Sequence, residues 1–266
     1  MIFLKEICHK GLAKLVGVCG SVYIDKKFIP ELLIASVKPD LENRQIIENN
    51  LDDLPKIIPI LFKWLIEHTV SAKELAILNL RNCYEAHLRD DPSLISFLGL
   101  VFHYITDWGT PYHSPVSLAN PVIGAIVIGG MGIGVLKIIV NRLSGSSELL
   151  NGVTKWGLSG ATASGGISLI SLYLKHKNFE EQCDEFWDNN KKLIIKQFLA
   201  QKKDFHLPRT FEEAIEIFEE KMNDLRIICN NTSPDWILSN NGNNFADYII
   251  QIAVVMDYAL QIIKYY

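Results

Sequence analysis

The sequence LGLVFHYITDWGTPYHSP at residues 98–115 decides the interpretation of this chain, because it combines an apolar helical pattern with three potential metal ligands. His103 and Asp107 are four residues apart, so a helix places both side chains on one face, one turn from each other. Gly-Thr-Pro at 109–111 ends that helix, and the chain then reverses and brings His113 back to the same point. Two imidazoles and a carboxylate that converge in this way are ligand types that zinc favours.

The remainder of the chain also has helical periodicity. We expect helices over residues 3–18, 55–68, 71–89, 92–108, 176–204, 210–228 and 244–265. Ser71 and Glu74 match a capping box, and Thr210 opens the helix that follows it. Strand-like alternation is scarce. We therefore predict an all-α protein, a compact multi-helix bundle around a metal cluster.

The composition limits the classes of function. The chain has 266 residues and a net charge of −4, which argues against a nucleic-acid binder that relies on a basic surface. This charge still allows an enzyme that acts on nucleic acid through metal ions. The five cysteines are widely spaced and form no CxxC, so we expect reduced, packed thiols. No signal peptide is evident, because charges such as Lys5, Glu6 and Lys10 interrupt any apolar run, and we expect no secretion by the usual route.

Two apolar, glycine-rich segments occupy the middle of the chain. Residues 121–140 contain one charge, Lys137, and residues 156–174 contain none. Each has about the 20 residues that are needed to span hydrocarbon, and small residues let two such helices pack closely. We expect a hydrophobic helical hairpin inserted at 118–174 into a single helical domain made of 1–117 and 175–266. A membrane-inserted hairpin, a buried helix pair and a lid over a pocket all fit this pattern.

Further potential ligands lie outside the 98–115 stretch. His176 and Glu180 are again four residues apart on a predicted helix, and Asp40 follows Pro39 at what reads as a loop position. A lone histidine in an apolar helix is more often a packed core residue, but the combined HxxxDxxxxxH and HxxxE pattern is more specific. His9 lies in the first predicted helix, and His68 lies at the end of the helix that contains Trp64. His87 and His206 have no such partner pattern, and we interpret both as non-ligands.

The 98–113 pattern resembles the zinc-dependent phospholipase C family, which shares its fold with fungal-type single-strand-specific zinc nucleases. The residues that carry the resemblance are Leu98-Gly99, His103-Tyr104, Asp107, Pro111 and His113, with Pro39-Asp40 before them and His176 and Glu180 after them. The resemblance implies a site with two or three Zn²⁺ ions held by His9, Asp40, His68, His103, Asp107, His113, His176 and Glu180.

The resemblance also implies how these ligands divide between the ions. Asp40, His68, His103 and Asp107 would hold one ion, and His113, His176 and Glu180 a second. His9 would hold a third, with Asp107 as a bridge. The chain departs from the family pattern at 114–175, where the connection between ligands is far longer than expected.

Zinc ions held by three carboxylates leave positive charge that suits a phosphodiester and its transition state. Asp40 is our candidate catalytic residue, which would orient or deprotonate the attacking water. The insertion leaves the bundle just after His113 and returns just before His176, so an insertion in a bilayer would bring the site to a membrane surface. Trp108, Tyr112 and Trp156 could stack on bases, but no basic run accompanies them.

We therefore expect a membrane-associated zinc phosphodiesterase of phospholipase C type that acts on phospholipid headgroups, with nucleic acid not favoured as a partner. Two alternatives stay open. One is a soluble zinc nuclease or phosphatase of the same fold. The other is a non-catalytic membrane protein in which the metal site is only structural.

Overall fold

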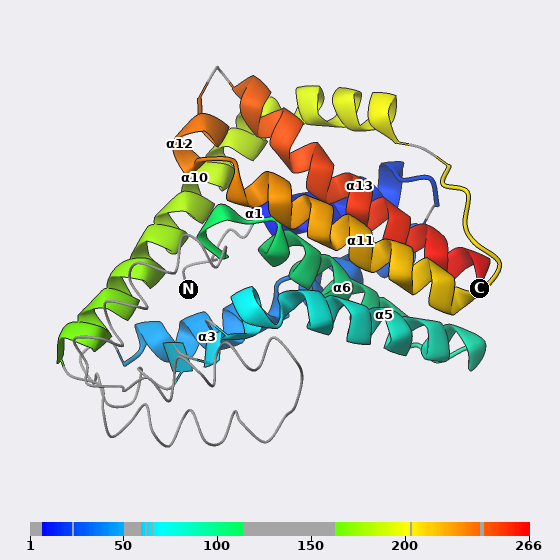
Figure 1. Cartoon of the computed structure of the whole chain (residues 1–266), viewed down its shortest axis with the longest axis horizontal. Helices are drawn as coiled ribbons and strands as arrows, with labels where there is room; N and C mark the ends of the chain where they lie inside the picture. The colour runs from blue at the N-terminus through cyan, green and yellow to red at the C-terminus, as the bar shows by residue number, and fades with distance from the viewer. Residues whose placement is uncertain are drawn as a thin grey trace.

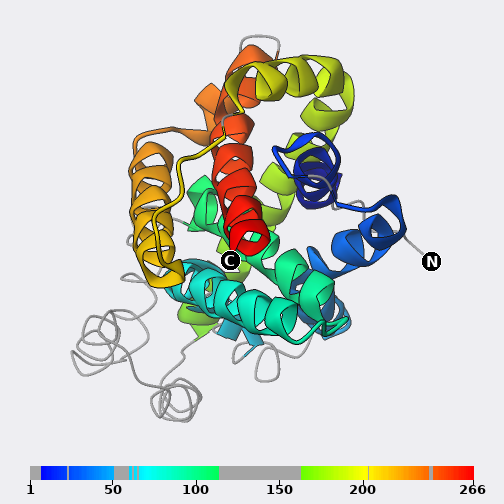
Figure 2. The ribbon, with the colours of Figure 1, turned by 90° about the vertical axis from the view of Figure 1, so that its right-hand side faces the viewer.

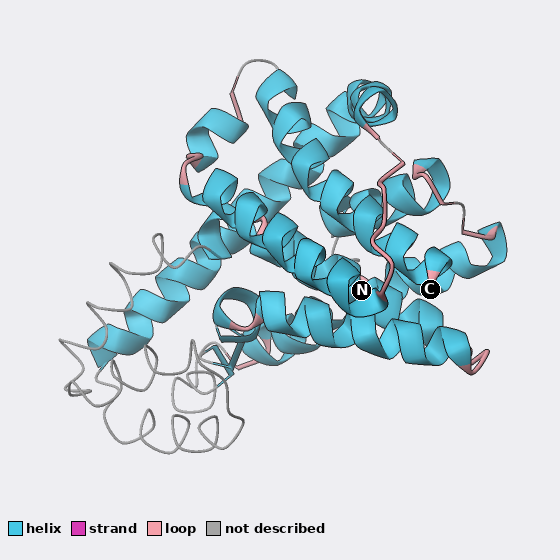
Figure 3. Cartoon of the chain, turned by 45° about the vertical axis from the view of Figure 1, so that its right-hand side comes forward, coloured by secondary structure: helices cyan, strands magenta, loops and turns pink. Residues whose placement is uncertain are grey.

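The computed structural model describes residues 7–22, 24–50, 60–61, 63–64, 66–113, 163–202, 204–239 and 242–266. Every regular element within these ranges is helical, and none of the described residues lies in a strand (Figure 3). The all-α prediction is thus confirmed. Residues 121–140, the first half of the predicted hydrophobic hairpin, lie outside the described residues, as do residues 156–162 at the start of the second half. The hairpin and the domain division that depends on it stay predictions.

The described α-helices are α1 (Ile7–Cys19), α2 (Ile29–Ala35), α3 (Lys38–Glu48), α5 (Ala72–Leu88), α6 (Leu94–Trp108), α10 (Ala163–Gln201), α11 (Phe211–Asn230), α12 (Pro234–Ile237) and α13 (Asn243–Tyr265). Three short turns connect some of them. They are the 3-10 turns η1 (Lys26–Phe28) and η3 (Pro111–His113) and the π-helical turn η2 (Ile66–Val70).

Helix α13 forms the centre of the bundle. It packs against α10, α11, α6 and α1, which surround it in the view of Figure 2. Within the described part of the chain it is the helix that is long and apolar enough to cross a membrane, but 83% of its apolar window is buried inside the protein. A core helix passes the same test, so this is weak evidence for a membrane span.

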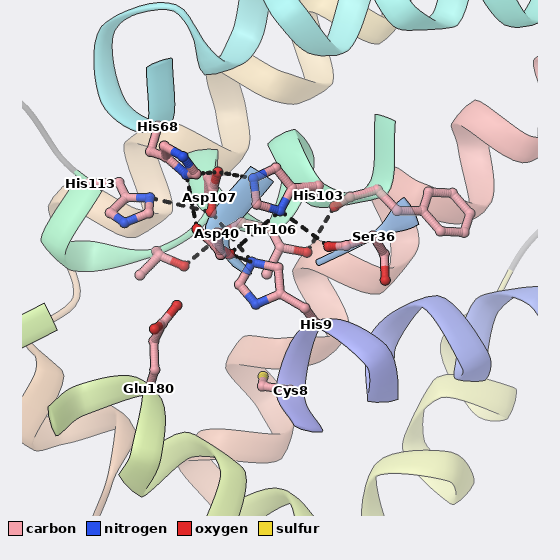
Figure 4. Close-up of polar contacts among 12 residues, drawn as sticks. Cys8, His9, Ser36, Asp40, His68, His103, Thr106, Asp107, His113 and Glu180 are labelled. Atoms are coloured by element: carbon pink, nitrogen blue, oxygen red, sulfur yellow. Dashed lines mark hydrogen bonds and ion pairs between the residues drawn. The ribbon is translucent and has the colours of Figure 1, made fainter. Parts of the chain in front are cut away.

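Helices α5 and α6 run alongside each other below α11 and α13 (Figure 1). Helix α2 packs on α6 at close range. At Gly99 of α6 there is no room for a side chain, since an added Cβ would lie 2.3 Å from the Cβ of Ala35 in α2. This approach brings α3, which follows α2 directly, toward the second half of α6. The fold thereby carries Asp40 to the same region as His103 and Asp107 (Figure 4).

The two predicted helix caps have different outcomes. Thr210 and Glu213 form the complete capping box at the start of α11, as expected for a Thr with Glu three residues later. The prediction of a capping box at Ser71 is wrong, because the Ser71 side chain makes no capping hydrogen bond. The chain enters α5 from the π-helical turn η2, and the Ser71 carbonyl already accepts the Leu75 amide at 2.8 Å. Ser71 has helical backbone angles (φ −103°, ψ 0°) and not the extended ones of a capping residue, which explains why its side chain does not cap the helix.

Helix α10 begins earlier than the predicted helix at 176. It runs without interruption from Ala163 to Gln201 and so contains the second half of the apolar segment 156–174. His176 and Glu180 lie within this long helix, one turn after Tyr173. The helix that carries two predicted ligands is therefore continuous with the apolar segment before it.

Candidate metal centre

The end of α6 places three of the predicted ligands. His103 and Asp107 are one turn apart and both fully buried. After Gly109 the chain turns, with the Thr110 amide bonded to the Asp107 carbonyl at 2.9 Å, and η3 brings the buried His113 back. Gly109 is required for space, because a Cβ there would lie 2.8 Å from Ile252 of α13. The predicted convergence of these three side chains is present (Figure 4).

Asp107 lies among four imidazoles that come from four different elements. Its Oδ1 is 3.3 Å from His9 Nε2 and 3.5 Å from His113 Nδ1. Its Oδ2 is 2.7 Å from His68 Nδ1 and 3.1 Å from His103 Nε2. Each carboxylate oxygen thus faces two ring nitrogens, which is an arrangement suited to a carboxylate shared between cations.

Asp40 faces the same cluster from α3. Its Oδ1 is 3.4 Å from His68 Nδ1, and its Oδ2 is 3.6 Å from His103 Nδ1 and 3.8 Å from His9 Nε2. The predicted loop position of Asp40 is wrong, because Asp40 lies in the first turn of α3. Pro39 is tolerated there, since the first amides of a helix have no intrahelical partner to lose.

His103 has a fixed orientation. Its Nδ1 is 3.1 Å from the carbonyl oxygen of Ser36, to which the Nδ1–H donates. A ring held in this way keeps the lone pair on Nε2, the atom that faces Asp107. Backbone hydrogen bonds of this kind typically support metal-ligating histidines.

His176 and Glu180 extend the cluster on the α10 side. His113 Nε2 is 3.2 Å from His176 Nε2, and His176 Nε2 is 3.2 Å from Glu180 Oε1. The other carboxylate oxygen, Oε2, accepts a hydrogen bond from Arg44 Nη2 at 2.6 Å. All eight predicted ligands therefore belong to one connected cluster.

Sequence reasoning missed Arg44, a buried residue in contact with a predicted ligand. Arg44 stands four residues after Asp40, so the two share one face of a helix. That spacing is the signal that would have found it. The interpretation of His87 and His206 as non-ligands fits the structure, in which both are exposed and outside the cluster.

The tightest groupings differ from the division that the resemblance implies. Ligand atoms within 4.8 Å of one another form two groups, which are His9, Asp40, His103 and Asp107, and His68, Asp107 and His113. His9 thus stands with Asp40 and His103 rather than apart, and His68 stands with His113. Asp107 belongs to both groups.

The donors of the cluster fit a bound cation. Several of its buried nitrogen and oxygen atoms make no hydrogen bond among the described residues; these are Asp40 Oδ2, His68 Nε2, His103 Nε2, His113 Nδ1, His176 Nδ1 and Glu180 Oε1. Buried polar atoms are normally satisfied, so a concentration of such atoms needs an explanation. These buried His and Asp groups could hold a metal ion.

In the protein without metal, Asp107 raises the pKa values of both His9 and His68. Burial alone would lower the pKa of His9, but the hydrogen bond with Asp107 and the charge of Asp40 raise it to about 10. Burial alone would also lower the pKa of His68, but the charges of Asp107 and Asp40 raise it to about 9. Burial and the neighbouring His176 hold the pKa of His113 well below its ordinary value. Cation binding would therefore displace protons from His9 and His68 near neutral pH.

The Trp64 ring and a small cavity border the cluster. The Trp64 ring lies 5.7 Å from the His113 ring and 5.1 Å from the His176 ring, measured between centroids, and it is buried. A cavity of about 30 Å³ adjoins His9 and Glu180 on the side of α1 and α10. This volume has room for water.

The cysteines are all free, and Cys8 and Cys183 line this cavity. The expectation of reduced thiols is therefore consistent with the structure. Neither thiol belongs to the close groups of potential ligands, so the donors of those groups are nitrogen and oxygen.

Comparison with known proteins gives no match: no family model, no curated protein and no solved structure matches this chain.

Proposed function

We propose that the protein is a zinc-dependent phosphodiester hydrolase that cleaves phospholipid headgroups at a membrane surface, in the manner of phospholipase C. The observation that carries the proposal is the buried Asp107 carboxylate, which is faced by four imidazoles and linked through them to Asp40. A structural site needs one closed set of four ligands. A carboxylate shared between two groups of donors instead supports a centre with more than one ion, as phosphodiester hydrolysis uses.

Zinc is the ion that we propose, in two or three copies, because it accepts histidine nitrogen and carboxylate oxygen in small coordination numbers. When bound, zinc would polarise the phosphoryl oxygens and lower the pKa of water to about 7. His9, Asp40, His103 and Asp107 would hold one ion, His68 and His113 would hold another with Asp107, and His176 with Glu180 would complete the set.

Asp40 is the residue that we propose to accept a proton from the attacking water. Its Oδ2 lies between His9 and His103 and makes no hydrogen bond with any described residue. A carboxylate oxygen with a free lone pair can orient a water molecule for attack at phosphorus. Arg44 would act differently, since it holds Glu180 Oε2 and leaves Oε1 to face His176.

Chain order supports a lipid substrate. His113 ends η3, and the next described residue is Ala163 at the start of α10, which leads to His176. The apolar segments 121–140 and 156–174 lie between or overlap these two attachment points. If they enter a bilayer, they tether the centre to the membrane surface, where phospholipid phosphodiesters are concentrated.

The test is an activity comparison on zinc-loaded protein in mild detergent. The substrates are a short-chain phosphatidylcholine below and above its micellar concentration, single-stranded DNA and a phosphomonoester. We expect release of phosphocholine that rises when micelles form. Preferred cleavage of DNA or of the phosphomonoester would favour the soluble nuclease or phosphatase instead. Bound zinc without turnover of any substrate would leave a structural metal site.

A further inference from the structure

Arg226 is a charged residue on the buried face of α11. Its neighbours on that face, Met222, Leu225 and Cys229, belong to the core, and Arg226 itself is only 7% exposed. Burying a cation is costly unless the charge is paired and its hydrogen bonds are made. The contacts of Arg226 therefore need to be accounted for one by one.

The guanidinium is held from one side only. Its central carbon lies 3.8 Å from the centroid of the Trp108 ring, and Nη1 donates weakly to Cys229 Sγ at 3.8 Å. The Trp108 ring is fixed in turn, since its Nε1 donates to the Met222 carbonyl at 2.7 Å. The planar group is thus stacked on a rigid aromatic face and cannot rotate freely.

The opposite edge of the guanidinium has no partner among the described residues. Both Nε and Nη2 are buried and make no hydrogen bond. These two nitrogens form the parallel pair of N–H groups with which arginine binds carboxylate or phosphate in bidentate fashion. Other arginines satisfy this need. Arg81 makes two bonds to Glu212 at 2.6 and 2.7 Å, and Arg44 pairs with Glu180.

No nearby carboxylate in the described ranges is free for this edge. Asp107 precedes Trp108 in the chain, but its two oxygens face the four imidazoles of the metal centre. Tyr248 and Cys229, the other polar neighbours, are neutral groups, and the Tyr248 hydroxyl donates to the Gly109 carbonyl. The described residues around Arg226 thus orient its Nε–H and Nη2–H donors but supply no acceptor for them.

We propose that Arg226 and Trp108 form a binding site for a phosphate oxyanion, separate from the metal centre. Two oxygens of the anion would accept hydrogen bonds from Nε and Nη2, while the stacked Trp108 holds the guanidinium in plane. Trp108, on which the guanidinium stacks, is itself partly exposed. The oxyanion comes either from free inorganic phosphate or from a soluble phosphomonoester.

The test is a titration of the full-length protein followed through the ¹⁵N-labelled arginine Nε–H signals. The Arg226 signal is assigned by its loss in Arg226→Lys, or by cross-relaxation with the Trp108 ring protons if that variant does not fold. We expect inorganic phosphate to shift this signal with a dissociation constant on the order of 1 mM. The Arg81 signal should stay in place, because Glu212 already binds both of its terminal nitrogens, Nη1 and Nη2, and so holds one of the two donors that a bidentate anion needs. Phosphocholine in a second titration distinguishes the two sources of the anion.

Two controls make the result specific. Sodium chloride at equal ionic strength should not move the Arg226 signal, and the constant should be the same with and without metal. By calorimetry, Arg226→Lys should weaken this phosphate site about tenfold, because lysine lacks the planar pair of donors, whereas Arg81→Lys should not. A signal that does not respond to phosphate, that responds equally to chloride, or that responds only in metal-loaded protein would overturn the proposal.

Discussion

Among the described residues, Asp107 on α6 and Asp257 on α13 are both carboxylates buried in apolar helices, and their partners differ in kind. Asp257 Oδ1 accepts the Ser21 amide at 2.7 Å, and its Oδ2 accepts the Ser21 hydroxyl at 2.8 Å and Gln261 Nε2 at 3.1 Å. Asp107 instead faces four imidazoles. Burial is equal in the two cases, so the chemistry of the partners separates a structural carboxylate from a candidate metal ligand.

The backbone supports this difference. At Asp257 the chain approaches so closely that a Cβ on Gly20 would lie 2.5 Å from Oδ1. Neutral donors and a glycine tie the end of α1 to α13 and leave no room for an ion. At Asp107 the neighbouring rings have nitrogens that make no hydrogen bond within the described part of the chain, such as His68 Nε2 and His113 Nδ1. The first arrangement is complete by itself, and the second could be completed by a bound cation.

The largest expected effect is that of Asp107→Asn. This change removes the charge shared by both groups of donors, so we expect zinc affinity to fall more than about 100-fold, beyond what loss of a supporting residue costs. Competition with a chromophoric chelator measures it. His87→Asn, an exposed histidine, is the matched control and should bind zinc as the wild type does. Equal zinc affinity of Asp107→Asn and wild type would remove Asp107 from the centre.

Asp257→Asn should have the opposite effect, since it should lower stability and leave zinc binding unchanged. We expect the free energy of unfolding to fall by about 2 kcal/mol, since hydrogen bonds to a charged acceptor are weakened and one buried donor is opposed. Zinc content should be unchanged. Urea unfolding and elemental analysis of the same preparation check both statements, and loss of zinc in folded Asp257→Asn would break the distinction between the two carboxylates.

Arg44→Gln tests the support of Glu180. We expect the weakest-bound zinc to lose affinity about tenfold, because Glu180 would no longer be oriented toward His176. Arg44→Lys should recover part of the loss, and Arg81→Gln removes an equal charge from the surface as control. A variant with unchanged zinc affinity and lowered stability would assign Arg44 a structural role only.

The pH dependence of stability should depend on whether metal is bound. In stripped protein the pKa values of His9 and His68 are raised above the ordinary value of 6.5, to about 10 and about 9. Their contribution to stability is therefore fully present below pH 6.5 and is lost as the pH rises through 9 to 10. Zinc-loaded protein should lack this loss, since its ligands are already deprotonated. Urea unfolding between pH 7 and 10 measures both forms, and parallel curves would contradict the prediction.

Local spacing predicted the parts of the site that local structure forms. The HxxxD pair and the Gly-Thr-Pro break suffice to bring His103, Asp107 and His113 together, since all three belong to one helix and the turn after it. The cap at Thr210 was predicted for the same reason. Ser71 has the same cap pattern, but its backbone is helical where that of Thr210 is extended, and its side chain makes no cap.

Features that depend on packing between distant elements were harder to predict. Asp40 was expected in a loop, because it follows Pro39 outside any helical pattern, but a first helical turn accepts proline. The grouping of His9 with Asp40 and His103 depends on how α1 and α3 pack on α6. No spacing within the sequence contains that information.

The most direct test of the metal centre is the zinc content of the wild-type protein, measured by mass spectrometry on material purified in detergent without exposure to chelator. We expect two or three zinc ions per chain, with fewer in His103→Ala/Asp107→Ala. A folded wild-type protein without bound zinc would contradict the metal centre and, with it, the proposed hydrolase.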